Sequence, residues 1–176
     1  MNQQEITLGG GCFWCLEAVY ELVDGVVAVQ SGYCNGQVKN PSYAQVCEGT
    51  TGHNEVVRVS FDADRISLRE VLEIFFNIHD PTTLNRQGND VGTQYRSGIY
   101  VQGAEQEAVA RAVLAEAQEA HRGRVVTEIV ALDNYSAAEA YHQHYFANNR
   151  EQGYCAFVVA PKVEKFRRTF KARVKA

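Results

Sequence analysis

Three consecutive glycines, Gly9-Gly10-Gly11, separate a short strand-like segment from a helical pattern near the start of the chain. Residues 6–8 have strand character, and apolar residues then recur at helical spacing, at Leu16, Val19, Tyr20 and Val23. Because glycine adopts backbone conformations that other residues resist, the run predicts a tight strand-to-helix turn. Cys12 is therefore expected at the N-terminus of the first helix.

Strand-like and helical segments alternate along only part of the chain. Strands are expected at 26–32, 56–61, 98–101 and 125–132. Helices are expected after the capping-box pair Ser67 and Glu70, over about 105–120, and after a second pair, Ser136 and Glu139, with Ala137, Tyr141 and Tyr145. The order predicts an α+β fold, with a mixed sheet, helices packed on one face and extensive irregular loops, rather than a doubly wound sheet.

The helix that follows Ser67 is expected to end near Asp80-Pro81, and residues 82–95 then show neither the strand nor the helix period. A compact domain seldom keeps so long an irregular segment unless it serves function, so this segment is predicted to be a site loop. With 176 residues, the chain is expected to form one domain over 1–176. Its core is expected at about 5–160, followed by a basic C-terminal helix or tail at 161–176.

The composition excludes several classes of protein. Apolar residues make up 45% and charged residues 22%, which is typical of folded rather than disordered chains. The net charge is −4 and the one basic cluster lies at 162–175, so nucleic-acid binding is not indicated. No apolar run is long enough to cross a membrane and no positively charged leader pattern opens the sequence, so a cytoplasmic location is expected. The five cysteines, an odd number, favour reduced or catalytic thiols over a disulfide scaffold.

Cys12 is the best candidate for covalent chemistry on its position alone. The free N–H groups and positive dipole end of a helix are expected to lower the pKa of a thiol beside them, and the thiolate is the nucleophile. The alternative is a small buried apolar side chain, the usual state of a free cysteine. Phe13 and Trp14 are then either core residues or the walls of an apolar pocket.

Cys12 and Cys15 also form a Cys-x-x-Cys pair, which is typical of a redox couple or of half a zinc site. Zinc would require a second pair, which Cys34 and Cys47 do not supply, and no His-Glu-x-x-His occurs, so no metal is expected. The histidines at 142 and 144 are expected to be surface or core residues.

Several separate blocks, in the same order, resemble the peptide methionine sulfoxide reductase A family. The resemblance extends from Ile6 to Cys155, and its blocks are Gly11-Cys12-Phe13-Trp14, Gly32-Tyr33, Asn40-Pro41-Ser42-Tyr43, Thr51-Gly52-His53-Asn54-Glu55, Gln87-Gly88-Asn89-Asp90, Gly92-Thr93-Gln94-Tyr95-Arg96-Ser97, Tyr141-His142-Gln143 and Gly153-Tyr154-Cys155. The resemblance implies a sandwich with a split βαβ core. It also implies reduction of the S epimer of methionine sulfoxide, free or in proteins, without a bound cofactor.

The resemblance also assigns roles to residues of the site. Cys12 would attack the sulfoxide sulfur, and Phe13 and Trp14 would enclose the substrate methyl group. Glu55 matches the catalytic carboxyl, with its pKa raised by desolvation, and Tyr43 and Tyr95 match two phenols that hold the sulfoxide oxygen. Asp90 matches a position that supports the nucleophile. Without the resemblance, Glu55 and Asp90 would be interpreted as solvated surface charges.

The thiol that resolves the Cys12 sulfenic acid remains open at this stage. Cys155 matches the recycling cysteine of the family, on a segment that Gly153 would allow to move. Cys15 stands where many relatives carry glycine, and is an alternative resolver or a relay partner. Cys34 and Cys47 are expected to be structural. A thioredoxin-type dithiol protein would reduce the final disulfide. The basic segment at 162–175, with Phe166 and Phe170 at helical spacing, is then a solvated helix or a docking site for an acidic reductant.

Two other functions fit parts of the sequence. A thioredoxin-like oxidoreductase would act on protein disulfides through Cys12 and Cys15, without any need for Glu55. A redox-sensing binding module would recognise oxidised peptides in the aromatic pocket without converting them.

Overall fold

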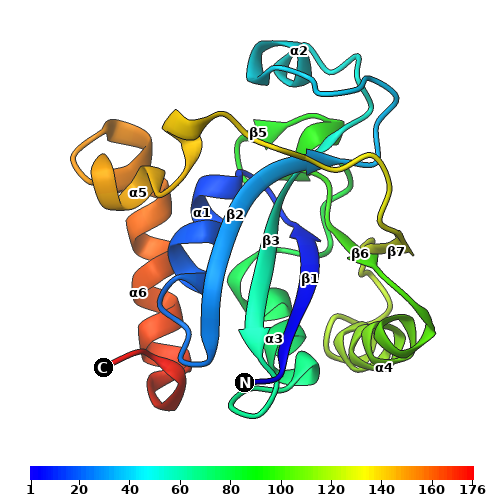
Figure 1. Ribbon diagram of the computed structural model, residues 1–176, viewed down its shortest axis with the longest axis vertical. Helices are drawn as coiled ribbons and strands as arrows, with labels where there is room; N and C mark the ends of the chain where they lie inside the picture. Colours follow the sequence, from blue (N-terminus) through cyan, green and yellow to red (C-terminus); the bar gives the residue numbers. More distant parts are fainter.

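Six strands form one mixed sheet in the order β7-β6-β1-β3-β2-β8 (Figure 1). The computed structural model describes residues 1–176. The strands of this sheet are β1 (Gln3–Gly9), β2 (Val26–Cys34), β3 (Asn54–Asp62), β6 (Gly98–Val101), β7 (Glu128–Ala131) and β8 (Ser136–Ala137). A separate two-stranded hairpin consists of β4 (Arg86–Gln87) and β5 (Asp90–Val91). All neighbouring strands of the sheet are antiparallel except β6 and β7, which are joined through a helix.

The main helices form a layer against the sheet, so the α+β prediction is confirmed. The helices are α1 (Phe13–Tyr20), α2 (Tyr43–Cys47), α3 (Leu68–Ile78), α4 (Ala104–Ala120), α5 (Tyr145–Asn148) and α6 (Ala160–Thr169). Helix α3 packs against both α4 and α6, and α6 packs against α1. None of the helices combines the length and the apolar character that a membrane span requires.

The centre of the sheet is a split βαβ unit. Strands β1 and β2 are connected by α1, and β3 lies between them, antiparallel to both. Leu8 near the end of β1 pairs with Val57 near the start of β3. The turn that leaves β1 therefore passes beside the first residues of β3, which brings Cys12 and Glu55 together from positions 43 residues apart in sequence.

The glycine run makes this close approach possible in two different ways. Gly11 has φ +92°, a left-handed conformation that side chains disfavour, and a Cβ there would lie 2.7 Å from Cγ of Gln87. Gly9 has an ordinary φ, but a Cβ there would overlap the side-chain amide of Asn54. The predicted strand-to-helix turn is confirmed, and only one of these two glycines is required for its backbone conformation.

The predicted capping box at the start of α3 is confirmed. The Ser67 hydroxyl accepts a hydrogen bond from the Glu70 backbone N–H at 3.1 Å, and Glu70 Oε1 accepts from the Ser67 backbone N–H at 3.4 Å. Helix α3 ends at Ile78, close to the predicted end. The segment at 82–95 contains only the β4–β5 hairpin and a short 3-10 turn, so the prediction of an irregular loop holds.

The predicted helix after Ser136 is wrong. Ser136 and Ala137 form β8 on the edge of the sheet, where they pair with Tyr33 and Gly32 of β2. Glu139 does not complete a capping box, because its carboxylate accepts hydrogen bonds from the Tyr33 hydroxyl and the Tyr43 backbone N–H, both at 2.9 Å. Long-range partners thus replaced the local cap. The strand expected at 125–132 is shorter, at Glu128–Ala131.

The C-terminal segment is helical, as its apolar spacing predicts. A π-helical turn at Cys155–Val159 runs directly into α6. Val163 and Phe166 are buried in the core, and the Phe166 and Phe170 rings stack with centroids 5.7 Å apart. The helix is therefore packed along its apolar face rather than solvated on all sides.

His79 lies directly behind the glycine turn, with its ring 3.0 Å from the position that a Cβ of Gly10 would take. The ring is buried, with Nδ1 2.6 Å from the Phe75 carbonyl oxygen and Nε2 2.7 Å from the Ser97 hydroxyl. Burial lowers the pKa of His79 from 6.5 to about 4. The folded protein thus holds this imidazole neutral at pH values where the unfolded chain protonates it.

We expect His79 to reduce the free energy of unfolding as the pH falls. Its contribution is present above pH 6.5 and is lost as the pH falls towards about 4, because the unfolded state binds the proton first. The full loss is about 3 kcal/mol at 1.36 kcal/mol per pKa unit. Urea unfolding at pH 7 and pH 4.5 checks this, with His79→Asn as the variant that lacks the titrating ring. An equal loss of stability in parent and variant would contradict it.

Candidate active site

Cys12 occupies the N-cap position of α1, directly after the glycine turn. Its side chain is 7% exposed, and its backbone carbonyl accepts a hydrogen bond from the Cys15 N–H at 3.1 Å. All five cysteines are free thiols. The predicted position of Cys12, at the start of the first helix, is confirmed.

The expected lowering of the Cys12 pKa is wrong. Burial, the largest cause, raises the pKa of the Cys12 thiol well above 9.0, and Glu55, once ionised at higher pH, raises it further. A hydrogen bond from the Trp14 backbone N–H acts in the opposite direction but is outweighed. The helix N-terminus therefore does not create a resting thiolate, and Cys12 is a protonated thiol at neutral pH.

Glu55 is the second residue of β3 and is fully buried. The Phe13 backbone N–H donates to its Oε1 at 3.3 Å, and its Oε2 is buried without any hydrogen-bond partner. Desolvation raises the pKa of Glu55 from 4.5 to about 8, against the lowering effect of the Phe13 hydrogen bond. The carboxyl is thus neutral at pH 7 and can donate a proton, as expected from the sequence.

Two phenols lie near this carboxyl. Tyr43 begins α2 and Tyr95 ends a 3-10 turn, and both side chains are partly buried. Burial is the first cause that raises the pKa of each phenol, and the Glu55 carboxyl is the second. Both remain protonated hydrogen-bond donors at neutral pH. The structure therefore brings Tyr43, Tyr95 and Glu55 together from three separate elements.

Asp90, in β5, is connected to the C-terminal segment. The Tyr154 hydroxyl donates a hydrogen bond to Asp90 Oδ2 at 2.5 Å. The negative charge of Asp90 contributes to raising the pKa values of Cys12 and Glu55. Asp90 thus lies near Cys12 and holds the residue that precedes Cys155.

Aromatic rings cluster beside Cys12, but they are not equally accessible. Phe13 is fully buried, with its ring centroid 6.3 Å from Tyr43 and 5.1 Å from His142. Trp14 is partly exposed, stacks on Tyr145 at 3.8 Å and donates from Nε1 to His142 Nδ1 at 3.1 Å. Phe13 therefore forms the floor of the aromatic cluster, and Trp14 forms its accessible wall.

The three cysteines considered for redox chemistry lie in one region. Burial raises the pKa of Cys15, and both Lys162 and Cys155 act on it electrostatically. The Cys155 side chain is completely buried in the π-helical turn, where its N–H donates to Gln152 Oε1 at 3.1 Å. Cys15 is therefore one helical turn from Cys12, whereas Cys155 lies in a separate helical segment. Cys34 is buried and Cys47 is exposed.

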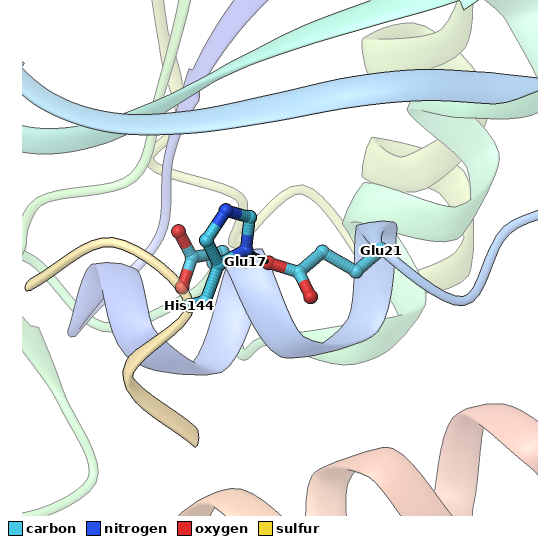
Figure 2. Close-up of side chains that lie close together, drawn as sticks. All are labelled: Glu17, Glu21 and His144. Atoms are coloured by element: carbon cyan, nitrogen blue, oxygen red, sulfur yellow. Dashed lines mark hydrogen bonds and ion pairs between the residues drawn. The ribbon is translucent and has the colours of Figure 1, made fainter. Parts of the chain in front are cut away.

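Glu17 in α1 and Glu21 directly after it lie close to His144, and atoms of these three side chains that could bind a metal are within 4.8 Å of one another (Figure 2). Glu17 Oε1 accepts from the Tyr145 N–H at 3.1 Å and its Oε2 accepts from the Ser31 hydroxyl at 3.3 Å. The His144 Nδ1 lies 2.6 Å from Glu21 Oε1. Both oxygens of Glu17 are thus already engaged, and the cluster ties residues 144–145 to α1.

Sequence reasoning missed two residues of the site. His142 was interpreted as a core or surface residue, yet its buried ring accepts from Trp14 and contacts Phe13 and Tyr43. Tyr154 was given no role, yet it binds Asp90 and lies edge-on to Trp14 with centroids 5.7 Å apart. Both residues belong to blocks that carried the family resemblance, which was the available signal.

Comparisons with known proteins agree with one another. Residues 4–174 match the family described as "Peptide methionine sulfoxide reductase". A curated protein of that name from Saccharolobus solfataricus is 52% identical over 169 residues, which cover 96% of each chain. The crystal structure of Mxr1 from Saccharomyces cerevisiae in reduced form has a TM-score of 0.84 at 39% identity, covering 88% of this chain and 90% of that one. Mxr1 in complex with Trx2 has a TM-score of 0.60 at 29% identity, covering 82% and 85%.

The raised pKa of Cys12 predicts slow alkylation at neutral pH. We expect iodoacetamide to label exposed Cys47 first at pH 7, with Cys12 at least about tenfold slower because little thiolate is present. The rate at Cys12 should then rise steadily from pH 7 to pH 9.5. Mass spectrometry of timed samples measures both sites, and Cys47→Ser isolates the slower reaction. Labelling of Cys12 that is fast and independent of pH in this range would contradict the prediction.

Proposed function

Since the chain belongs to the peptide methionine sulfoxide reductase family, we propose that its aromatic site reduces the S epimer of methionine sulfoxide to methionine. The observation that carries this function is the pairing of a thiol, Cys12, with a buried neutral carboxyl, Glu55, across the start of α1. The substrate is methionine sulfoxide, either free or in oxidised proteins. A thioredoxin-like disulfide exchange is not favoured, since such a reaction needs no buried acid.

The sulfur of Cys12 attacks the sulfoxide sulfur as the oxygen accepts a proton. The overall step converts a thiol and a sulfoxide into a sulfenic acid and a thioether, so the oxygen moves to Cys12 and no other reactant is needed. Glu55 donates a proton to the sulfoxide oxygen and regains the proton that the thiol loses. Because both groups are neutral beforehand, charge develops only when substrate is bound.

The free oxygen of Glu55 supports this role. Oε2 is buried and has no hydrogen-bond partner, so a hydrogen bond with a substrate oxygen would provide the missing partner. We propose that Tyr43 and Tyr95 donate hydrogen bonds to the same oxygen, since both phenols remain protonated. Asp90 acts indirectly, through its charge and its hydrogen bond from Tyr154.

The substrate methyl group belongs against the aromatic rings. We propose that Trp14 forms the accessible side of this pocket and Phe13 its floor, because Trp14 is partly exposed and Phe13 is not. Each buried carbon contributes about 0.8 kcal/mol to binding. Two hydrogen-bonded contacts, Trp14 to His142 and Tyr154 to Asp90, keep the pocket in place.

The sulfenic acid on Cys12 then condenses with a second thiol, which gives a disulfide and water. We propose that Cys155 is this thiol, with Cys15 as an alternative resolver or a relay. Tyr154 supports Cys155, because its ring and hydroxyl already anchor that segment in the site. The irregular π-helical turn is a natural place for the chain to open.

A thioredoxin-type dithiol protein reduces the disulfide. Its two thiols supply two hydrogens and two electrons, which restore the cysteines and leave the partner oxidised. The complex of Mxr1 with Trx2, a similar chain, supports this choice of partner. We also propose a cytoplasmic location, since five free thiols and a reductant of this kind suit a reducing compartment.

Single-turnover chemistry tests the proposed function. We expect the reduced protein, without added reductant, to form methionine from the S epimer and none from the R epimer. Chromatography measures the methionine formed for each protein molecule. Cys12→Ser should abolish the product, whereas Cys34→Ser should leave it unchanged. Conversion of the R epimer alone, or product from Cys12→Ser, would refute the proposal.

Disulfide mapping tests the resolving thiol. After oxidation by one equivalent of substrate, we expect a link between Cys12 and Cys155, because Tyr154 holds that segment beside the nucleophile. Peptide mapping under non-reducing conditions detects the link, which should persist in Cys15→Ser and disappear in Cys155→Ser. A dominant link between Cys12 and Cys15 in the parent protein would overturn the assignment.

A further inference from the structure

Basic side chains from distant parts of the chain surround one groove of about 570 Å³. Lys162 and Lys165 come from α6, and His121 and Arg124 come from the turn after α4. The floor of the groove includes His79 and Gln87, the two residues that pack behind the glycine turn. The groove therefore lies at the back of the catalytic turn.

The cations of this groove outnumber its acidic residues and form no ion pairs. None of Lys162, Lys165 and Arg124 takes part in an ion pair, although the protein carries a net charge of −4. Asp80 is the one acidic residue that lines the groove, and it accepts hydrogen bonds from the backbone and hydroxyl of Thr82. The groove thus presents a net positive charge, with three cations against one carboxylate, on an otherwise acidic protein.

The position of the groove relates it to the recycling thiol. Lys162 follows Cys155 by seven residues in one continuous helical run, so the two residues are separated along the helix axis by no more than about 10 Å. A protein that docks over Cys155 buries about 800 Å² of each partner, a patch roughly 16 Å in radius. Such a partner covers Lys162 and reaches the groove.

An apolar anchor lies at the same end of this run. Phe157, two residues after Cys155, is 83% exposed, whereas Val159 and Val163 on the same run are buried. Exposed aromatic residues beside charged rims are typical of protein interfaces. Phe157 therefore lies within the segment that carries Cys155, and the basic groove lies beyond the C-terminal end of that segment.

We propose that this groove, together with Phe157, is the docking surface for the reductant. The partner is a dithiol protein with an acidic surface beside its reactive cysteines. The proposal rests on the proposed function, because only a disulfide-forming cycle needs such a partner. The groove guides the encounter and sets the salt dependence of recycling, while the two thiols of the partner carry out the reduction.

The test reverses charge within the groove and compares two reductants. Lys165→Glu and Arg124→Glu are combined, and Lys171→Glu with Lys175→Glu is the matched control elsewhere on the C-terminal segment. Lys162 is left unchanged, because its charge acts on Cys15. Turnover of the S epimer is measured with an acidic thioredoxin, recycled by its reductase and NADPH, and separately with dithiothreitol, which is small and uncharged.

We expect the groove variant to lose at least about tenfold in kcat/KM for the acidic thioredoxin at low salt. The loss should shrink in 0.5 M NaCl, and turnover with dithiothreitol should stay within about twofold of the parent. The control variant should behave as the parent with both reductants.

Three results would overturn the proposal: an unchanged kcat/KM for thioredoxin in the groove variant, an equal loss in the control variant, or an equal loss with dithiothreitol. Absence of turnover in the parent protein with dithiothreitol would instead refute the proposed function, so the two failures are distinguishable.

Discussion

The site depends on a buried hydrogen bond, from the Phe13 backbone N–H to Oε1 of Glu55. It joins the first turn of α1 to the start of β3, and so fixes the thiol of Cys12 relative to the acid. The split βαβ topology makes this contact possible, because β3 runs back between β1 and β2. Burial keeps Glu55 protonated, and a rise in pKa from 4.5 to about 8 corresponds to about 5 kcal/mol against its ionised form.

The site therefore works with neutral groups. Cys12 and Glu55 are both protonated at rest, and neither is paired with a cation. A neutral site whose thiol and acid are both buried favours a substrate with a polar bond but no charge, such as a sulfoxide, and strengthens each hydrogen bond to the sulfoxide oxygen. Cys155 is also buried, within a helical turn, so the recycling role that we propose for it requires a change of the C-terminal segment after the chemistry.

Local patterns predicted the elements that depend on nearby residues. The glycine turn, the Ser67 capping box and the position of Cys12 follow from interactions within a few residues. The helix expected after Ser136 failed because Glu139 binds Tyr33 and Tyr43, partners that are about 100 residues away. The prediction of a lowered pKa for Cys12 is wrong for the same reason, because burial by distant segments raises the pKa more than the helix terminus lowers it. The assignment of Glu55 to the site came only from the family resemblance, because no local sequence pattern distinguishes this residue from a surface charge.

The protonation state of Glu55 is the most direct test of this account. Difference infrared spectra of the parent protein and Glu55→Gln isolate the carboxyl stretch of this single residue, and can be recorded from pH 5 to pH 10. The account predicts a protonated carboxyl at pH 7 that ionises near pH 8. A carboxylate signal already complete at pH 6 would contradict it, because Glu55 would then have no proton to give.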